Sequence, residues 1–263
     1  MTIITLTTDF GDKDGFVGTM KGVIWGIFPE AQIADITHAI SPQNVLEGAY
    51  ALWRAYSYFP AGTVHIAVID PGVGSNRRPI AAKVGTHYFV GPDNGLFTLM
   101  YEDTQKGGWS IEIVELVNKQ YWLQNISHTF HGRDIFAPVA AHLARGAPFL
   151  ELGVPIQDPI QIPLPKPEKT TKGWRAQIVA IDHFGNCTTN LPAQVVTGRG
   201  EITIHLLGHT IDGIVPYYGR KNTGELIALV DSENYIEIAI VNGNASDSLG
   251  VKVGDILDVL VEP

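Results

Sequence analysis

The segment VHIAVIDPGVGSNRRPIAAKV, residues 64–84, joins two apolar runs through a turn that holds an acid, two glycines and two arginines. The first run is rich in β-branched residues and predicts a buried strand that ends at Asp70. The Pro-Gly-x-Gly turn permits the chain to fold back, which brings Arg77 or Arg78 near Asp70. A guanidinium beside a carboxylate keeps the acid ionised and orients it, although such a pair on a surface stabilises little.

On both sides of this segment, strand and helix patterns alternate. Period and turn signals predict strands over 2–10, 31–37, 63–70 and 111–117, helices over 15–29, 41–60 and 132–146, and a hairpin or neighbouring strands over 79–85 and 87–95. Ser41 is the expected N-cap of the second helix, with Pro42 at its first position. Such alternation predicts a largely parallel sheet with helices on its faces.

The composition changes in the proline-rich segment 153–174, which predicts an extended linker. Beyond it lie short strand patterns separated by Gly, Asn and Asp, which predict a small all-β barrel or sandwich. We therefore expect an α/β fold in which a Rossmann-like domain, 1–164, precedes an all-β domain, 165–263, with the linker at about 155–172.

Charge and composition exclude several classes of protein. The 263 residues carry a formal net charge of -9, which disfavours a nucleic-acid partner. Cys187 is the only cysteine, so no intrachain disulfide can form. The first residues do not resemble a signal peptide, and no apolar run is long enough for a membrane span. We expect a cytoplasmic protein with no membrane partner.

Two acids follow strands whose carboxyl ends should share one sheet edge. Asp9 and Asp70 hold these positions, where open parallel sheets bind ligands, although an acid there also commonly caps the next turn. His131 precedes the third predicted helix, whose N-terminus favours a neutral imidazole that can accept or relay a proton. A capping role for His131 is as well supported as a functional one. The neighbouring His128 is a weaker candidate for a functional role. These residues predict a site rather than three separate caps.

Phosphate-loop, dinucleotide and metal motifs are missing from the sequence. Neither GxxxxGK[ST] nor a helix-opening GxGxxG occurs, and there is no HExxH. The acids at Asp12 and Asp14 faintly resemble a calcium loop that lacks its Gly and its closing Glu. Asp93 adds one more candidate ligand. We expect neither a metal nor a cofactor.

Five motifs resemble one known family in the same order along the chain. They are TLTTDFG (5–11), VIDPGVGSNRRPIA (68–81), VGPDNGLF (90–97), TFHGRDIFAPVAAHL (129–143) and IDHFGNCTTNL (181–191). They resemble the S-adenosyl-L-methionine (SAM) hydroxide adenosyltransferases, relatives of fluorinases and chlorinases. The resemblance implies an N-terminal α/β domain, a C-terminal β-barrel, and a homotrimer that binds its ligand between subunits.

The resemblance also implies the site residues. The family's catalytic Asp, Arg and His correspond to Asp70, Arg77 and His131, with Arg77 rather than Arg78 at the matching spacing. Positions implied to bind substrate are Asp9 for the ribose, Asn94, Asp182 for the amino group, Phe184 and Asn186 for adenine, Ser232 for the methionine end, and the backbone of Gly243, Asn244 and Ala245.

The implied reaction is attack of water-derived hydroxide on the 5′ carbon of SAM, which yields adenosine and L-methionine. By the same resemblance, the halogenases differ from this chain. They carry tyrosine, serine and tryptophan at the positions that match Asp70, Gly132 and Gln43, and they have an extra loop. Arginine stays protonated and is no base, but the sequence leaves open how proton transfer is divided within the triad. A sensor that binds an adenosyl ligand without turnover is the main alternative, and a halogenase is a weaker one.

Overall fold

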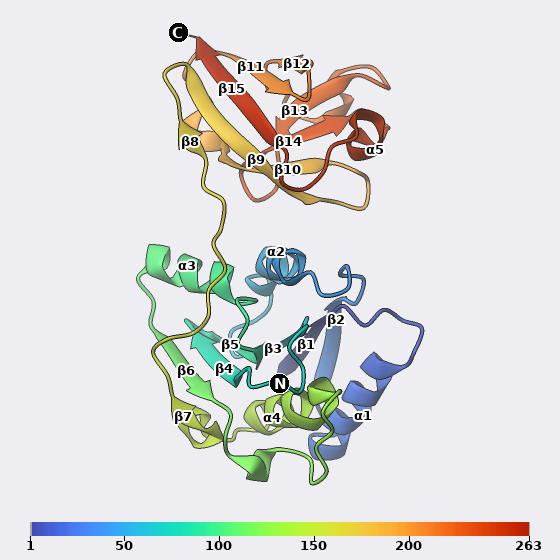
Figure 1. The fold of residues 1–263 in the computed structure, drawn as a ribbon, viewed down its shortest axis with the longest axis vertical. Helices are drawn as coiled ribbons and strands as arrows, with labels where there is room; N and C mark the ends of the chain where they lie inside the picture. Colours follow the sequence, from blue (N-terminus) through green and yellow to red (C-terminus); the bar gives the residue numbers. More distant parts are fainter. Residues whose placement is uncertain (1, 263) are drawn as a thin grey trace. The chain divides into compact units, whose positions relative to one another are not determined.

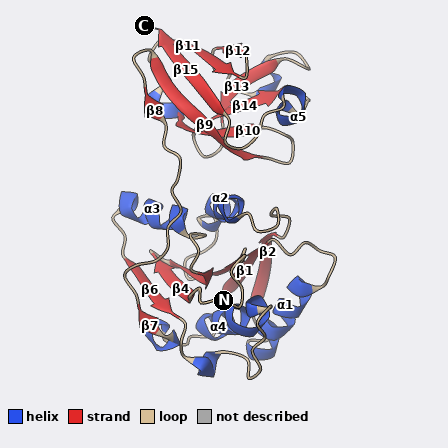
Figure 2. Ribbon diagram, viewed as in Figure 1, coloured by secondary structure: helices blue, strands red, loops and turns tan. Residues whose placement is uncertain are grey.

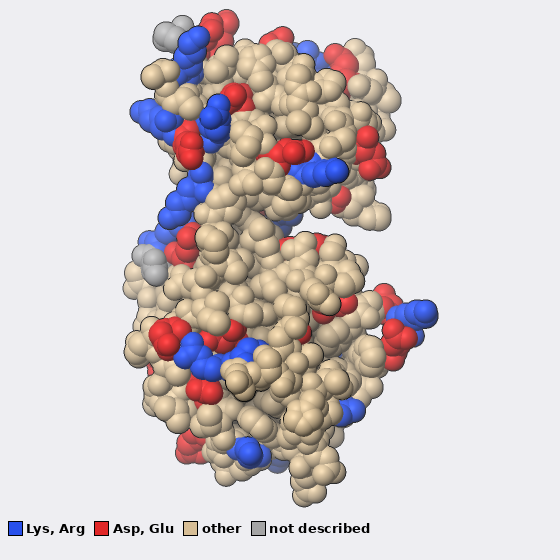
Figure 3. Space-filling view, in the orientation of Figure 1, with Lys and Arg blue, Asp and Glu red and all other residues tan. Residues whose placement is uncertain are grey.

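The computed structural model describes residues 2–262, except for the side chain of Gln105, and divides into two compact units. The first unit runs to Ile162 and the second begins at Pro163. On the face shown in Figure 3, acidic and basic side chains are intermingled in small groups rather than gathered by sign. No helix within residues 2–262 is long and apolar enough to cross a membrane.

A seven-stranded sheet in the order β2-β1-β3-β5-β4-β6-β7 forms the centre of the first unit. Its strands are β1 (Ile3–Thr8), β2 (Gln32–Thr37), β3 (Val64–Val68), β4 (Pro79–Val84), β5 (His87–Pro92), β6 (Ile111–Glu115) and β7 (Val154–Pro155). β2, β1, β3 and β5 are parallel, and β4, β6 and β7 are antiparallel to their neighbours. The expected parallel pairing is therefore correct for four strands. β4 and β5 form the expected hairpin, whose two-residue turn is too short for a crossover.

Helices cover both faces of this sheet (Figure 1). α1 (Phe16–Ile27) and α4 (Ala137–Ala144) pack together on one face, and α2 (Val45–Tyr56) and α3 (Thr98–Gly107) lie on the other. Short helical turns are η1 (Lys119–Tyr121), η2 (Gly132–Phe136) and η3 (Phe149–Leu152). The core between the sheet and the first helix pair is fully buried at Leu6, Ile24, Ile66 and Phe136. The α/β class expected for this part of the chain is confirmed.

The start of α2 differs from the prediction, because Ser41 is not its N-cap. The helix begins at Val45, and the Asn44 side chain caps it by accepting the Glu47 N–H at 3.2 Å. Gln43 has φ +67°, a left-handed conformation that interrupts any helix begun at Ser41. The Gln43 N–H is instead donated to a carboxylate oxygen of Asp9 at 2.7 Å.

The second unit is an almost closed antiparallel barrel, which confirms the all-β class (Figure 2). Its strands are β8 (Glu168–Lys169), β9 (Gly173–Ile181), β10 (Cys187–Pro192), β11 (Glu201–Leu206), β12 (His209–Asp212), β13 (Leu226–Val230), β14 (Tyr235–Ile240) and β15 (Ile256–Glu262), with helical turns η4 (Ala193–Val195), η5 (Tyr218–Arg220) and α5 (Ala245–Leu249). Seven of them follow the order β12-β11-β15-β9-β10-β14-β13, and β8 pairs with β9. A bridge from Val215 to Leu229 links the two ends.

Arg78 holds part of the proline-rich segment against the first unit. Its Nε donates to the buried Asp93 carboxylate at 2.8 Å, and its Nη1 donates to Asp158 at 2.9 Å. The other Asp93 oxygen accepts the Ile160 N–H at 2.8 Å. The start of the predicted linker is therefore anchored, and Arg78 is committed to that anchor rather than to Asp70.

Two buried histidines lie beneath the sheet's second helix pair. His65 receives or donates a hydrogen bond at Nδ1 with the Thr5 hydroxyl at 2.8 Å, and its Nε2 lies 3.2 Å from Nδ1 of His87. Burial, reinforced by the charge of His87, lowers the pKa of His65 to about 3. Folding therefore requires a neutral His65 across most of the acidic range.

This burial predicts that the first unit loses stability as the pH falls below the ordinary histidine pKa. The unfolded chain binds a proton at His65 from about pH 6.5 downward, whereas the folded chain does not until the pH approaches 3. The contribution of His65 to the free energy of unfolding is thus fully present above pH 6.5. At pH 5 this free energy is lower by about 2 kcal/mol because of His65 alone. Urea unfolding of wild type and His65→Asn between pH 7.5 and pH 5 measures it. An equal pH dependence in the two proteins would contradict the assignment.

Candidate active site

The sheet places two acids at one edge of the first unit. β1 and β3 are parallel neighbours, with Thr8 opposite Val68, so Asp9 and Asp70 leave the sheet together. Both side chains line a cavity of about 360 Å³. The remaining lining residues are Phe10, Phe16, Pro42, Gln43, Val68, Pro71, Val73, Thr129, Phe130, His131 and Gly132. The structure thus brings Asp9, Asp70 and His131 to a single cavity.

Arg77 holds the Asp70 carboxylate from behind the cavity. Its Nε lies 3.0 Å from each carboxylate oxygen, and its Nη2 donates a further short hydrogen bond to Oδ2. The two side chains are only 9% and 4% exposed. The guanidinium also stacks on the Phe136 ring, 5.1 Å from its centroid. This forked contact orients Asp70 and keeps a countercharge beside it.

The turn predicted to return the arginine to the acid requires glycine at one position. Gly74 has φ +75°, and a Cβ there would lie 2.2 Å from the backbone oxygen of His128. The turn therefore packs directly against the segment that leads to His131. His128 contributes this backbone oxygen, while its side chain is exposed and does not line the cavity.

His131 completes the cluster by accepting a hydrogen bond from Arg77. Nη2 of Arg77 lies 3.0 Å from Nδ1 of His131. Since a guanidinium only donates, Nδ1 must hold a lone pair, and a neutral His131 carries its proton on Nε2. Burial lowers the pKa of His131 and the Arg77 charge adds to this, while Asp70, Asp134 and the Ser127 backbone act in the opposite direction. The imidazole is therefore held neutral as a donor through Nε2.

An aromatic wall faces these polar groups. Phe10, Phe16 and Phe130 contact one another edge to face, with ring centroids 5.2 to 6.0 Å apart. All three line the cavity, and Phe16 is exposed. The cavity therefore combines an apolar side with an ionised carboxylate, the pattern of a small-molecule site.

Asn94 lies near this edge of the sheet but does not line the cavity. Its side-chain amide donates to the Ile69 carbonyl at 2.8 Å and accepts the Leu96 N–H at 3.2 Å. Ile69 directly precedes Asp70, so Asn94 fixes the backbone from which the acid emerges. Its implied contact with substrate stays a prediction.

In the second unit, the loop after β9 is organised by Asp182. One of its carboxylate oxygens accepts the N–H groups of Phe184 and Asn186 at 2.9 and 2.8 Å, and the other accepts the Asn186 amide at 3.0 Å. This arrangement leaves Phe184 70% exposed. Asn244 packs against Gly185, where a Cβ would lie 1.9 Å from its side-chain oxygen.

The loop 243–245 is therefore adjacent to the loop 182–186, and Ala245 is fully buried. The binding roles implied for these two loops stay predictions. Ser232 lies elsewhere, in the turn between β13 and β14. Tyr235 pairs with Pro192 and Ile238 with Cys187, which puts that turn at the opposite end of β14. The second unit by itself does not bring Ser232 to the other implied positions.

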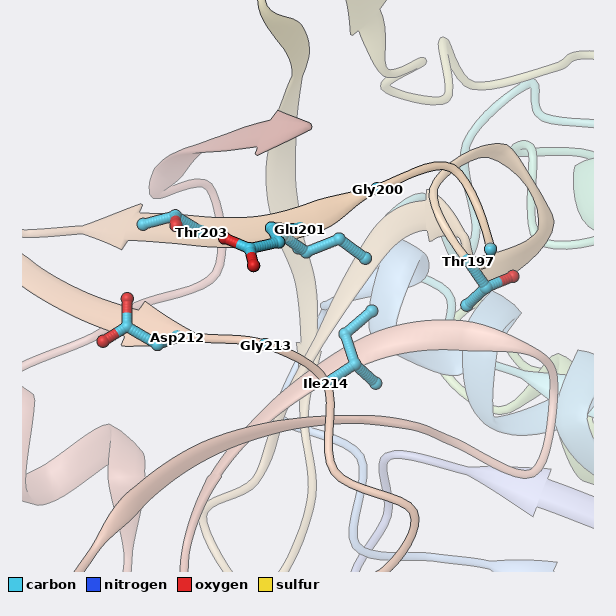
Figure 4. A pocket seen from close by; sticks show the side chains of 9 residues that line it. Thr197, Gly200, Glu201, Thr203, Asp212, Gly213 and Ile214 are labelled. Atoms are coloured by element: carbon cyan, nitrogen blue, oxygen red, sulfur yellow. The ribbon is translucent and has the colours of Figure 1, made fainter. Parts of the chain in front are cut away.

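A larger cavity, of about 530 Å³, also belongs to the second unit. Figure 4 shows Glu201 and Asp212 on its facing strands, with Thr197 and Ile214 near the loop end. Both acids are exposed, and no candidate catalytic residue lines it. The clustered polar chemistry lies in the smaller cavity of the first unit. Among residues 2–262, no group of three or more His, Cys, Asp or Glu side chains is arranged to hold a metal ion.

Comparison with known domain families places the chain. The profile of the SAM hydroxide adenosyltransferase N-terminal domain matches residues 4–153, and that of the C-terminal domain matches residues 176–258. The chain belongs to the SAM hydroxide adenosyltransferase family. The resemblance noted from its five motifs is confirmed.

Members of the SAM hydroxide adenosyltransferase family are similar to this chain over nearly its whole length. The (R)-S-adenosyl-L-methionine hydrolase of Salinispora tropica is 39% identical over 97% of each chain. That of Thermus thermophilus is 36% identical over 97% of this chain and 98% of its own. The crystal structure of a conserved protein from Thermotoga maritima has a TM-score of 0.89 at 38% identity, over 97% of this chain and 99% of that one. A fluorinase of Actinoplanes sp. is more distant, at 27% identity over 90% of each chain.

Two residues next to the triad, Asp134 and Ser127, were not predicted from the sequence. Asp134 is buried and binds Ser127, four residues before His131. The motif TFHGRDIFAP contains Asp134, but an acidic residue inside a predicted helix is expected to be exposed to solvent. The π-helical turn η2, Gly132–Phe136, is what turns it inward.

Proposed function

We propose that this protein hydrolyses SAM to adenosine and L-methionine through attack of a water-derived hydroxide on the 5′ carbon. The observation that carries the proposal is the hydrogen-bonded chain Asp70–Arg77–His131 at the edge of a cavity that also holds Asp9. Relatives named as SAM hydrolases, 36–39% identical over nearly full length, support the same activity.

The chemistry needs alignment and removal of one proton. A sulfonium leaves as a neutral thioether, so no acid is required at the leaving group. The water oxygen forms its bond to the 5′ carbon as the carbon–sulfur bond breaks and its electron pair returns to sulfur. The water must therefore lie in line with that bond and lose a proton as it attacks.

The hydrogen bonds divide these tasks among the three residues. Asp70 lines the cavity as an ionised acceptor with lone pairs that Arg77 does not use, so we assign it the water proton. Arg77 fixes the carboxylate, and its charge stabilises developing hydroxide. His131, whose Nδ1 is occupied by Arg77, orients the cluster and donates through Nε2.

We further propose the homotrimer that the resemblance implies, in which the cavity of one subunit is completed by the second unit of a neighbour. The first domain, 1–164, then supplies the catalytic residues and the second, 165–263, supplies Asp182, Phe184, Asn186, Ser232 and the backbone of 243–245 for adenine and the methionine end. The Phe184 ring supports this, since it contacts only the edge-to-face neighbour His183 among the ring contacts of its own described unit and is still 70% exposed. The buried single thiol, Cys187, fits the expected cytoplasmic location.

The decisive experiment is incubation of the purified protein with SAM in water labelled with heavy oxygen. Label in the 5′ hydroxyl of adenosine is the expected result, and it identifies both the reaction and the nucleophile. Tight retention of unreacted SAM would favour the sensor instead. Turnover only on addition of chloride or fluoride, with halogenated adenosine as product, would favour a halogenase, which the carboxylate of Asp70 and the lower identity to fluorinases disfavour.

Asp9 is expected to act in binding rather than in catalysis. Asp9→Asn keeps an acceptor for the Gln43 N–H but removes the charge that two ribose hydroxyls would share. Loss of a charged acceptor should weaken binding of adenosine between about tenfold and a hundredfold. Calorimetry measures this, with Asp14→Asn, an exposed acid nearby, as the control. Equal adenosine affinity in wild type and Asp9→Asn would rule out the role.

A further inference from the structure

A second carboxylate lies next to the triad without touching the cavity. Asp134 is 0% exposed, yet it carries a charge and lies within the π-helical turn η2 that follows His131. It is absent from the cavity lining, so it has no direct contact with a ligand there. A buried carboxylate costs free energy unless hydrogen bonds compensate it.

The compensating hydrogen bonds come from Arg133 and from Ser127, which lies in the segment that leads into His131. The Ser127 N–H and hydroxyl each donate to Oδ2 at 2.7 Å. The same hydroxyl accepts the Phe130 N–H at 3.1 Å. Arg133 donates to Oδ1 at 2.6 Å. Residues 127–130 are thus held in one compact turn by a single carboxylate.

Asp134 also belongs to the electrostatic surroundings of the imidazole. The charged groups around His131 are Arg77 and Asp70 from the turn after β3, Asp134 and its partner Arg133 from η2, and Asp9 across the cavity. Although burial raises the pKa of Asp134, hydrogen bonds from Arg133 and Ser127 lower it below its ordinary value. Asp134 is therefore ionised at neutral pH and favours protonation of His131.

We propose that Asp134 is a positioning residue for the reaction: through Ser127 it fixes the turn that presents His131 to Arg77, and so sets the geometry of Asp70. The proposal rests on the function proposed above. Arg133 alone would satisfy a buried carboxylate, but two hydrogen bonds to Ser127 connect this one to the catalytic histidine's own segment.

The first test is Asp134→Asn, which keeps the shape of the side chain and removes its charge. A misplaced triad should lower kcat between about tenfold and a hundredfold, while KM for SAM changes by less than about threefold. A protonated His131 cannot accept the hydrogen bond from Arg77, so activity should be lost below the pKa of His131. Without the Asp134 charge that pKa falls, and the acid limb of the kcat profile should move to lower pH. A purely structural role would leave the limb in place.

The matched control is Asp103→Asn. Asp103 accepts hydrogen bonds from Trp53 at 2.7 Å and Tyr56 at 3.2 Å, in the same unit but away from the triad. Its loss should lower stability and leave the pH profile unchanged. Ser127→Ala removes the hydroxyl that binds Asp134 but keeps the charge of Asp134. It should lower kcat without moving the acid limb of the pH profile. It also tests the proposal if Asp134→Asn does not fold. Unchanged kcat in both Asp134→Asn and Ser127→Ala would overturn the proposal.

A readout independent of turnover separates this proposal from the proposed function. NMR titration of the imidazole signals, with the His131 signal identified by its loss in His131→Gln, should show a lower His131 pKa in Asp134→Asn than in wild type. The same pKa in both proteins would overturn the link. If wild type does not hydrolyse SAM but the His131 signal shifts, the proposed function fails while the link from Asp134 to His131 stands.

Discussion

Asp70→Ala is expected to bind SAM and to lose turnover by about a thousandfold, the scale of a missing general base together with lost alignment. Asp70 is the cavity-wall carboxylate that Arg77 holds, and among the described residues Arg77 forms no ion pair with another acid. Binding should survive, because Asp9 and the aromatic wall are untouched. Calorimetry with SAM and detection of adenosine by chromatography measure the two effects separately.

The control for this variant is Asp12→Ala, which removes an exposed acid from the loop after β1. Truncating Asp70 leaves the 9% exposed Arg77 without its partner, so circular dichroism must first establish that the variant is folded. A folded Asp70→Ala protein that forms adenosine at the wild-type rate would show that the catalytic assignment is wrong.

Gly74→Ala should disable the site without changing any polar group. The new Cβ would lie 2.2 Å from the His128 backbone oxygen, and φ of +75° is already unfavourable for alanine. Either the turn after β3 or the segment before His131 must move, which separates Arg77 from its partners. We expect a loss of more than about 2 kcal/mol in stability and at least about a tenfold loss of turnover.

Gly62→Ala supplies the matched comparison for this prediction. Gly62 has φ +86°, but a Cβ there meets nothing within 4 Å. Gly62→Ala should therefore lower the free energy of unfolding by only about 1 kcal/mol, the effect of the unfavourable φ of alanine, and should leave turnover unchanged. Urea unfolding and kinetic assays on both variants test the difference. Equal losses would mean that the contact with His128 is easily relieved.

The positions of Asp9 and Asp70 were predictable because they depend on strong local signals. Each acid ends a short β-branched run, and the parallel pairing of β1 with β3 brings such ends to one edge. The return of Arg77 followed from the Pro-Gly-x-Gly turn. The sequence left Arg77 and Arg78 equivalent by geometry, and the structure separates them through Asp93, fifteen residues away along the chain.

Other features had no local signal. α3 (Thr98–Gly107) has no side-chain cap, and its apolar residues Leu99, Met100 and Tyr101 are consecutive rather than spaced along one helical face, so no period predicted it. The cap of α2 moved to Asn44 because Asp9 takes the Gln43 N–H, a tertiary contact. The inward turn of Asp134 depends on the π-helical η2, which sequence periodicity does not reveal.

Arg77 and Arg78 are consecutive, yet Arg77 donates to Asp70 at the cavity and Arg78 donates to Asp158 in the proline-rich segment. Insertion or deletion of one residue between Asp70 and Arg77 would change the spacing that returns the Arg77 guanidinium to Asp70. Evolution and protein engineering should therefore find this stretch intolerant of changes in length and, at Gly74, Arg77 and Arg78, of exchanges of side chain as well.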